Sequence, residues 1–234
     1  MTACENGCHK IETDDQNGSF KHLFENENCI HCHKCVNVCN YGAMEICGYS
    51  ATVDEVIHEA LKDKAFYGKK GGITLSGGEP MTQPEFANSI LKTAKDKKLT
   101  TCVETCGIGT EKLDMELCDY IYYDIKTSDS QLHKKLTGMD NGKIISNLIN
   151  LSETDPSKIY IRSVIVKGIT DTEKHVNDII DVIKPLGITH FDLLAFHPYG
   201  SSKANTLGMK REFMGKEYIP GEENFRKLKE SINL

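Results

Sequence analysis

The sequence predicts an α/β fold in two parts: a small cysteine-rich metal module over residues 1–49, then a partial (β/α) barrel or open parallel sheet over residues 50–234. Two observations predict it. Seven of the ten cysteines lie within the first 47 residues, and a dense cysteine cluster in a cytosolic chain indicates metal binding rather than disulfides. From residue 50 onward, β-like runs alternate with amphipathic helical segments, which is typical of parallel βα units.

The overall composition excludes several classes of protein. The formal net charge is −6 and no basic block is present, so a nucleic-acid partner is not expected. No apolar run approaches the roughly 18 residues that span a membrane, and no signal-peptide core begins the chain. Hydrophobic residues make up 39% of the chain and fall in periodic runs, which excludes disorder. We therefore expect a soluble cytoplasmic protein without a membrane partner.

From residue 50 onward, local signals mark the predicted elements. Thr52 and Glu55 have capping-box spacing and begin a helix whose apolar face runs to Leu61. Thr170 and Glu173 have the same spacing ahead of a second amphipathic helix that runs to residue 183. The β-like runs are residues 73–75, 99–105, 120–125, 158–166 and 190–196. The other helical segments are residues 82–97, 129–136, 142–152 and 222–231.

The ends of the predicted strands carry most of the unusual residues. The β-like runs are fewer than the eight strands of a complete barrel, so we expect a partial one. In either architecture, the loops that follow the strands form the functional rim. The residues at these positions are Gly77, Gly78, Glu79, Glu104, Thr105, Asp124, Ile125, Lys126 and His197. Their placement indicates an enzyme.

The cysteine module contains a ferredoxin-type motif. Cys29, Cys32, Cys35 and Cys39 have the spacing C-x2-C-x2-C-x3-C, which is typical of [4Fe–4S] ligation. Asn40 stands where a proline is usual. The alternative is a zinc site that uses a neighbouring histidine, although structural zinc sites normally use two separated C-x2-C pairs.

A short internal repeat extends this motif. Residues 39–46 align without gaps on residues 4–11, with Cys, Gly and Ile at matching offsets. If the repeat is real, crossed ligation would place Cys4 with Cys29, Cys32 and Cys35 on one cluster and Cys39 on another. The alternative is chance similarity between two short segments.

An ordered set of motifs resembles one family across essentially the whole chain. After the cysteine motif come Gly-Gly-Ile-Thr-Leu-Ser-Gly-Gly-Glu-Pro at 71–80, Val-Glu-Thr-Cys-Gly at 103–107, Asp-Ile-Lys at 124–126, His-Lys-Lys-Leu-Thr-Gly at 133–138, Ile-Arg at 161–162 and Phe-His-Pro-Tyr-Gly at 196–200. This set resembles the glycyl-radical enzyme activating enzymes, which are radical S-adenosylmethionine (SAM) proteins related to the pyruvate formate-lyase activating enzyme. The subgroup with an inserted ferredoxin-like domain is the most similar.

The resemblance implies how the methionine part of SAM is held. The turn Gly77-Gly78-Glu79 would receive its ammonium group, which requires hydrogen-bond acceptors. Asp124, Ile125 and Lys126 resemble the family's Asp-x-Lys, in which the lysine meets the SAM carboxylate.

The resemblance also implies further contacts near the cofactor. Glu104, Thr105 and Asp124 would form a cation site beside the SAM carboxylate, and His197 would lie beside the cofactor. Arg162 would contact the cofactor or the partner's glycine loop, with an internal ion pair as the alternative. Among the remaining cysteines, Cys106 would approach the cofactor, whereas Cys102 and Cys118 are expected in the core.

The activity that the resemblance implies is reductive cleavage of SAM to methionine and a 5′-deoxyadenosyl radical. That radical would abstract hydrogen from a glycine of a partner glycyl-radical enzyme. The implied cofactors are SAM and [4Fe–4S] clusters, and the implied electron source is a low-potential donor such as flavodoxin or ferredoxin. The cofactors supply the difficult chemistry and the protein positions them, so we expect no catalytic side chain.

One motif of the family does not occur in the chain. No C-x3-C-x2-C is present, and this motif binds the cluster that cleaves SAM. We therefore expect that an N-terminal segment with the first strand and this motif is missing, and that the chain is inactive alone. Two other hypotheses stay open: a non-catalytic ferredoxin-like electron-transfer or SAM-binding protein, and a zinc-stabilised α/β barrel with unrelated chemistry.

Overall fold

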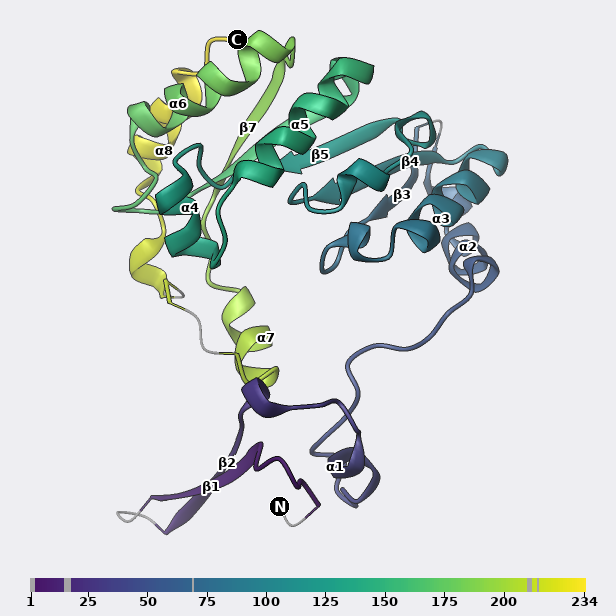
Figure 1. The fold of residues 1–234 in the computed structure, drawn as a ribbon, viewed down its shortest axis with the longest axis vertical. Coiled ribbons are helices and arrows are strands. Elements are labelled where there is room, and N and C mark those ends of the chain that lie inside the picture. The colour runs from purple at the N-terminus through teal and green to yellow at the C-terminus, as the bar shows by residue number, and fades with distance from the viewer. Residues whose placement is uncertain (1–2, 15–17, 69, 210–211, 214) are drawn as a thin grey trace. The chain divides into compact units, whose positions relative to one another are not determined.

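The computed structural model describes residues 3–14, 18–68, 70–209, 212–213 and 215–234, which fall into two compact units (Figure 1). The first unit comprises Met1–Ser50 and His197–Tyr218, and the second comprises Ala51–Phe196 and Ile219–Leu234. The chain thus passes from the first unit to the second after residue 50 and returns to the first for one later segment. Among the described residues, no helix is both long enough and apolar enough to cross a membrane.

The second unit is built on a parallel sheet of five strands. Its strands pair in sequence order, β3-β4-β5-β6-β7, and every pairing is parallel. Their bounds are β3 (Gly72–Leu75), β4 (Thr100–Thr105), β5 (Tyr120–Asp124), β6 (Ile159–Ile165) and β7 (His190–Ala195). The prediction of five parallel strands in a partial barrel is confirmed.

Helices cover one face of this sheet (Figure 1). The α-helices of the second unit are α2 (Val53–Lys62), α3 (Pro84–Asp96), α4 (Ser130–Thr137), α5 (Gly142–Thr154), α6 (Glu173–Ile183) and α8 (Glu222–Glu230). Side chains of a strand alternate between the two faces, so Ile121 and Tyr123 of β5 are buried in the core while Tyr122 and Asp124 are half-buried on the other face. The face without the main core is therefore polar and partly accessible.

The two predicted capping boxes have different outcomes. The Thr52 hydroxyl accepts from Glu55 N at 3.3 Å and the Glu55 carboxylate accepts from Thr52 N at 2.7 Å, so the first is confirmed. The second is wrong, because the N-cap of α6 is Thr172. The Thr170 hydroxyl instead accepts from Val166 N at 2.8 Å, which closes the loop after β6. Thr170 is therefore a loop residue that stabilises the turn after β6, and it does not cap α6.

Among its described residues, the first unit contains an antiparallel strand pair and two short α-helices. Its elements are β1 (His9–Asp14), β2 (Ser19–Phe24), α1 (Lys34–Asn37) and α7 (Gly200–Thr206). The sequence patterns predicted neither the hairpin nor α7, because these segments bury too few side chains to show a clear apolar period. The ferredoxin-like fold expected for residues 1–49 stays a prediction, and residues 1–2 and 15–17 of that range lie outside the described residues.

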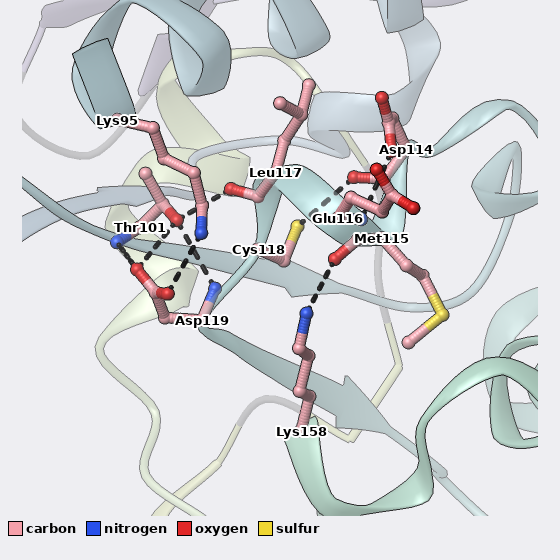
Figure 2. A network of polar contacts seen from close by, with 9 residues as sticks. All are labelled: Lys95, Thr101, Asp114, Met115, Glu116, Leu117, Cys118, Asp119 and Lys158. Carbon is pink, nitrogen blue, oxygen red and sulfur yellow. Dashed lines mark hydrogen bonds and ion pairs between the residues drawn. The ribbon is translucent and has the colours of Figure 1, made fainter.

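A polar network ties together the amino-terminal ends of β4, β5 and β6 (Figure 2). Asp119 accepts from Thr101 N at 2.9 Å and from Lys95 Nζ at 3.0 Å, and the Thr101 hydroxyl donates to Leu117 O at 2.6 Å. Cys118 lies within the network and is fully buried, and burial raises its pKa to about 12. Cys102 is also buried, so the expectation of two core cysteines is confirmed.

We expect Asp119→Ala to lower the free energy of unfolding by about 2 kcal/mol, because Thr101 N–H lies on a fully buried residue and would lose its acceptor. Desolvation raises the pKa of Asp119, but bonds from Thr101 and Lys95 outweigh it and hold the pKa below its ordinary value. The stabilisation is therefore present above the ordinary carboxyl pKa and is lost as the pH falls through the folded-state value. Urea denaturation between pH 3 and 7 measures both effects.

The matched control is Glu116→Ala, which removes an exposed carboxylate from the same segment (Figure 2). Its expected change is below about 0.5 kcal/mol at every pH. Equal losses in the two variants would contradict a specific role for Asp119.

Candidate functional site

The parallel sheet brings several predicted residues to one edge. The turn Gly77-Gly78-Glu79 follows β3, Thr105 ends β4, and Asp124 ends β5. Asp124 pairs in register with Arg162 of β6. Because parallel strands end at the same edge, residues far apart in the sequence meet here.

The Glu79 carboxylate is held by three donors. The Thr105 hydroxyl and Met81 N donate to Oε1 at 2.8 and 3.1 Å, and Cys106 N donates to Oε2 at 2.8 Å. A carboxylate has about four acceptor positions, so most of those on Glu79 are occupied by protein. The side chain thereby fixes the turn after β3 to the loop after β4.

The loop after β4 has a tightly specified shape. Gly107 has φ +92°, and a Cβ there would lie 2.0 Å from the Tyr123 hydroxyl oxygen, so only glycine fits. Its N–H donates to the Thr105 hydroxyl at 2.9 Å. Burial raises the pKa of the neighbouring Cys106 thiol, which favours the neutral form.

Arg162 joins two carboxylates across the edge of the sheet. Its Nη1 donates to Glu104 in a short ion pair, and its Nε donates to Asp124 at 3.2 Å. Glu104 also accepts from the Ser76 hydroxyl at 2.6 Å, and Lys126 Nζ lies 2.8 Å from Asp124. The side chains of Arg162 and Asp124 are only 18% and 23% exposed, so solvent screens this array weakly.

The charges within this array balance. Two carboxylates, Glu104 and Asp124, face the cations Arg162 and Lys126. The hydrogen bond from the Ser76 hydroxyl and, to a smaller extent, the contact with Arg162 hold the pKa of Glu104 below its ordinary value. Both contacts favour the ionised carboxylate. The expected cation site of Glu104, Thr105 and Asp124 is not assembled as one group: Thr105 bonds Glu79, and Arg162 lies against both carboxylates.

A row of aromatic rings lies beside the array and was not predicted as part of the site. Tyr122 packs edge-on to Tyr160 with ring centroids 5.6 Å apart, and Tyr160 stacks on His190 at 4.0 Å. The Arg162 guanidinium lies 4.8 Å from the centre of the Tyr122 ring, a cation–π contact that adds to its ion pairs. The sequence signal was the aromatic run of residues 120–123, in which Tyr120 and Tyr122 share one face of the strand.

The remaining predicted site residues divide between the units. Ile125 is buried and its N–H donates to Arg162 O at 2.9 Å, so it continues the pairing of β5 with β6 and anchors Lys126. His197 belongs to the first unit, where its ring lies 4.7 Å from that of Tyr199. The other predicted cofactor residues all belong to the second unit.

The two copies of the cysteine repeat have the same local turn. Gly7 N donates to Cys4 O and Gly42 N donates to Cys39 O, with glycine φ values of +65° and +63°. Backbone N–H groups, led by that of Cys8, lower the pKa of the Cys4 thiol. Backbone N–H groups led by that of Met44 do the same for Cys39. This likeness supports the repeat.

The predicted metal ligands Cys4, Cys29, Cys32, Cys35 and Cys39 all lie in the first unit. A cavity of about 300 Å³ is lined by Cys4, Cys35 and Cys39 together with His9 and His22. Thiols suit iron–sulfur ligation chemically. Within the described part of the chain, however, no three His, Cys, Asp or Glu side chains are close enough to hold one metal ion.

Comparison with known proteins agrees with this architecture. Residues 24–183 match the model of the radical SAM superfamily. The chain is 30% identical over 224 residues to the 4-hydroxyphenylacetate decarboxylase activating enzyme of Clostridioides difficile strain 630, covering 91% of this chain and 71% of that protein. It is 33% identical over 233 residues to the isethionate sulfite-lyase activating enzyme of Desulfovibrio desulfuricans, covering 97% and 71%.

A solved structure is similar in fold. A domain of the pyruvate-formate lyase-activating enzyme from Bacteroides vulgatus aligns with a TM-score of 0.55 and 24% identity, covering 68% of this chain and 91% of that one. The chain therefore belongs to the radical SAM superfamily, and within it to the activating enzymes of glycyl-radical enzymes. This family uses a [4Fe–4S] cluster and SAM, and its chemistry is of the oxidoreductase type.

Proposed function

We propose that this protein activates a glycyl-radical enzyme in the cytoplasm and that the edge formed by β3 to β6 binds SAM. The observation that carries the proposal is the array of Glu104, Arg162, Asp124 and Lys126 beside the turn that ends at Glu79. The relatives named above act on a decarboxylase and on a sulfite-lyase. The proposed partner is accordingly a glycyl-radical enzyme that presents a glycine for hydrogen abstraction.

The residues present fit the methionine half of SAM. The turn before Glu79 offers main-chain carbonyls and the remaining carboxylate position to an ammonium group. Lys126 offers its ammonium to a carboxylate, and Arg162 keeps Asp124 in place because it holds the other oxygen of that side chain. Bound together, the cluster and SAM supply the 5′-deoxyadenosyl radical chemistry of the family. The protein's part is to hold the ammonium and carboxylate groups of the methionine at fixed positions and to limit water access.

The cysteines of the first unit fit a cluster by donor type. We propose that Cys4, Cys29, Cys32 and Cys35 hold one [4Fe–4S] cluster and that Cys39 belongs to a second. Such clusters would receive electrons from a low-potential donor such as flavodoxin or ferredoxin. The shared turn at Cys4 and Cys39 supports this assignment.

Anaerobic reconstitution of the chain with iron and sulfide is expected to incorporate about four iron atoms per chain, because only the first proposed cluster has four cysteine ligands in this sequence. The Cys32→Ser variant should lose this iron because it removes a central ligand, whereas Cys47→Ser, outside the motif, should retain it. Iron and acid-labile sulfide analysis measures the content. Zinc without iron would instead support a zinc-stabilised fold.

The chain alone is expected to release no 5′-deoxyadenosine from SAM under dithionite, because its ten cysteines include no C-x3-C-x2-C. A fusion that supplies a C-x3-C-x2-C segment ahead of the chain is expected to produce it after reconstitution. The same fusion with Lys126→Met serves as the matched control and should be impaired. Product formation by the chain alone would contradict the role given to the motif, and an inactive reconstituted fusion would contradict the proposed function.

A further inference from the structure

Asn147 connects helix α5 to the loop after β4. Asn147 is only 1% exposed. Its side-chain Nδ2 donates to Gly107 O at 2.7 Å and to the Glu111 carboxylate at 2.9 Å. Its buried Oδ1 has no hydrogen-bond partner in the part of the chain that the structure describes. An unpaired buried acceptor destabilises a fold, so an apolar residue would suit stability alone at least as well. The contribution of this amide to the structure therefore comes from the two hydrogen bonds that Nδ2 donates.

The contact with Gly107 continues directly to Glu79. Gly107 N donates to the Thr105 hydroxyl, and that hydroxyl donates to the Glu79 carboxylate at 2.8 Å. Cys106 N, in the same loop, donates to the other Glu79 oxygen. Asn147 thus acts on the position of Glu79 through one short loop, without touching the turn itself.

Asn141 has the same relation to the loop after β5. It directly precedes α5 and is 5% exposed, and its Nδ2 donates to Thr127 O at 3.1 Å and to Ser128 O at 2.9 Å. These carbonyls immediately follow Lys126. The Tyr123 hydroxyl of β5 also donates to Ile144 O of α5 at 2.6 Å, which fixes the helix to the sheet between the two loops.

We propose that Asn141 and Asn147 are positioning residues that use α5 as a common frame to set the spacing between Glu79 and Lys126. This inference rests on the proposed function, in which Glu79 lies at the ammonium group and Lys126 at the carboxylate group of the methionine moiety. Neither amide contacts the site directly. Each instead donates to the main chain of a loop that carries a binding residue. Binding of a flexible ligand gains from such preorganisation, because less ordering remains to be done on association.

The test compares Asn147→Leu and Asn141→Leu with Ser152→Ala, which alters a buried polar residue of α5 whose hydroxyl donates to Ile149 O of the same helix. Hydrogen exchange of the full chain is followed by mass spectrometry. Asn147→Leu is expected to speed exchange of residues 104–109 about tenfold, and Asn141→Leu that of residues 125–129. The unfolding midpoint of Asn147→Leu should stay near wild type, because Gly107 O keeps the Thr110 hydroxyl at 2.9 Å.

Unchanged exchange in these loops, or equal acceleration throughout β6 and α6, would overturn the inference. Equilibrium dialysis with SAM supplies the second measurement, and each variant is expected to weaken binding about tenfold relative to Ser152→Ala. Normal SAM affinity in a variant with faster loop exchange would overturn the link to the cofactor. A wild-type chain that binds no SAM would contradict the proposed function, and loop exchange would still decide whether the two amides fix the loops.

Discussion

Replacing Arg162 with leucine is expected to abolish measurable SAM binding and to lower the free energy of unfolding by about 3 kcal/mol. The substitution leaves Glu104 and Asp124 without their shared guanidinium, on side chains that are only 30% and 23% exposed. Removing one partner of a poorly solvated ion pair costs more than the pair itself contributes, because an uncompensated charge remains. Lys126 would then neutralise Asp124 alone and would be less free to meet a ligand carboxylate.

The matched control for Arg162 is Arg226→Leu. Arg226 and Glu230 form an exposed pair on α8 at 4.0 Å, with side chains 71% and 70% exposed, so its loss is expected to change stability by less than about 0.5 kcal/mol. Urea denaturation and SAM dialysis measure both variants. Arg162 helps to lower the pKa of Glu104, so the wild-type protein should lose stability as the pH falls through that pKa. The Arg162→Leu variant should lose less stability over the same pH range, because this contribution is already missing from it. Equal SAM affinity and equal stability of the Arg162→Leu and Arg226→Leu variants would contradict the role given to Arg162.

The second large effect is expected for Glu79→Ala. The substitution removes the acceptor of Thr105, Cys106 N and Met81 N together, so the turn after β3 would no longer be fixed to the loop after β4. We expect a loss of SAM affinity of at least tenfold, which corresponds to about 1.4 kcal/mol. Stability is expected to fall by about 2 kcal/mol, since two of the three donors are backbone amides.

Two further variants make this result specific. Glu79→Gln should have an intermediate effect, because one amide oxygen can still accept while the NH2 group would face a donor. Glu85→Ala removes an exposed carboxylate just beyond the turn and should leave SAM affinity unchanged. Dialysis and urea denaturation of all three give the comparison. A Glu79→Ala protein with wild-type affinity would show that the turn does not hold the ligand.

Local sequence patterns predicted the second unit well. In β6, for example, Ile159, Ile161 and Ile165 are buried in the core, whereas Tyr160 and Arg162 are half-buried on the other face. Residues such as Glu104 and Asp124 follow from this alternation together with strand-end position. Which carboxylate pairs with which cation does not follow, because Arg162 meets Glu104 across an intervening strand and only the three-dimensional register brings them together.

Other features lacked any local signal. Asn141 and Asn147 lie on or beside an ordinary amphipathic helix, and their importance depends on carbonyl groups 13 and 40 residues away. The capping-box spacing at Thr170 was misleading because Thr172, two residues later, offers an equally good hydroxyl at the actual start of α6. The hairpin β1–β2 buries little apolar surface, so hydrophobic periodicity could not predict it.

The most direct test of the central claim is SAM-dependent protection from hydrogen exchange in the full chain. If the edge formed by β3 to β6 holds the methionine moiety, SAM is expected to protect residues 76–82 and 124–128, and Lys126→Met should remove that protection. The buried network at Thr101 and Asp119 lies at the other end of the strands and should be unaffected. An absence of protection at saturating SAM, or protection confined to other segments, would contradict the account.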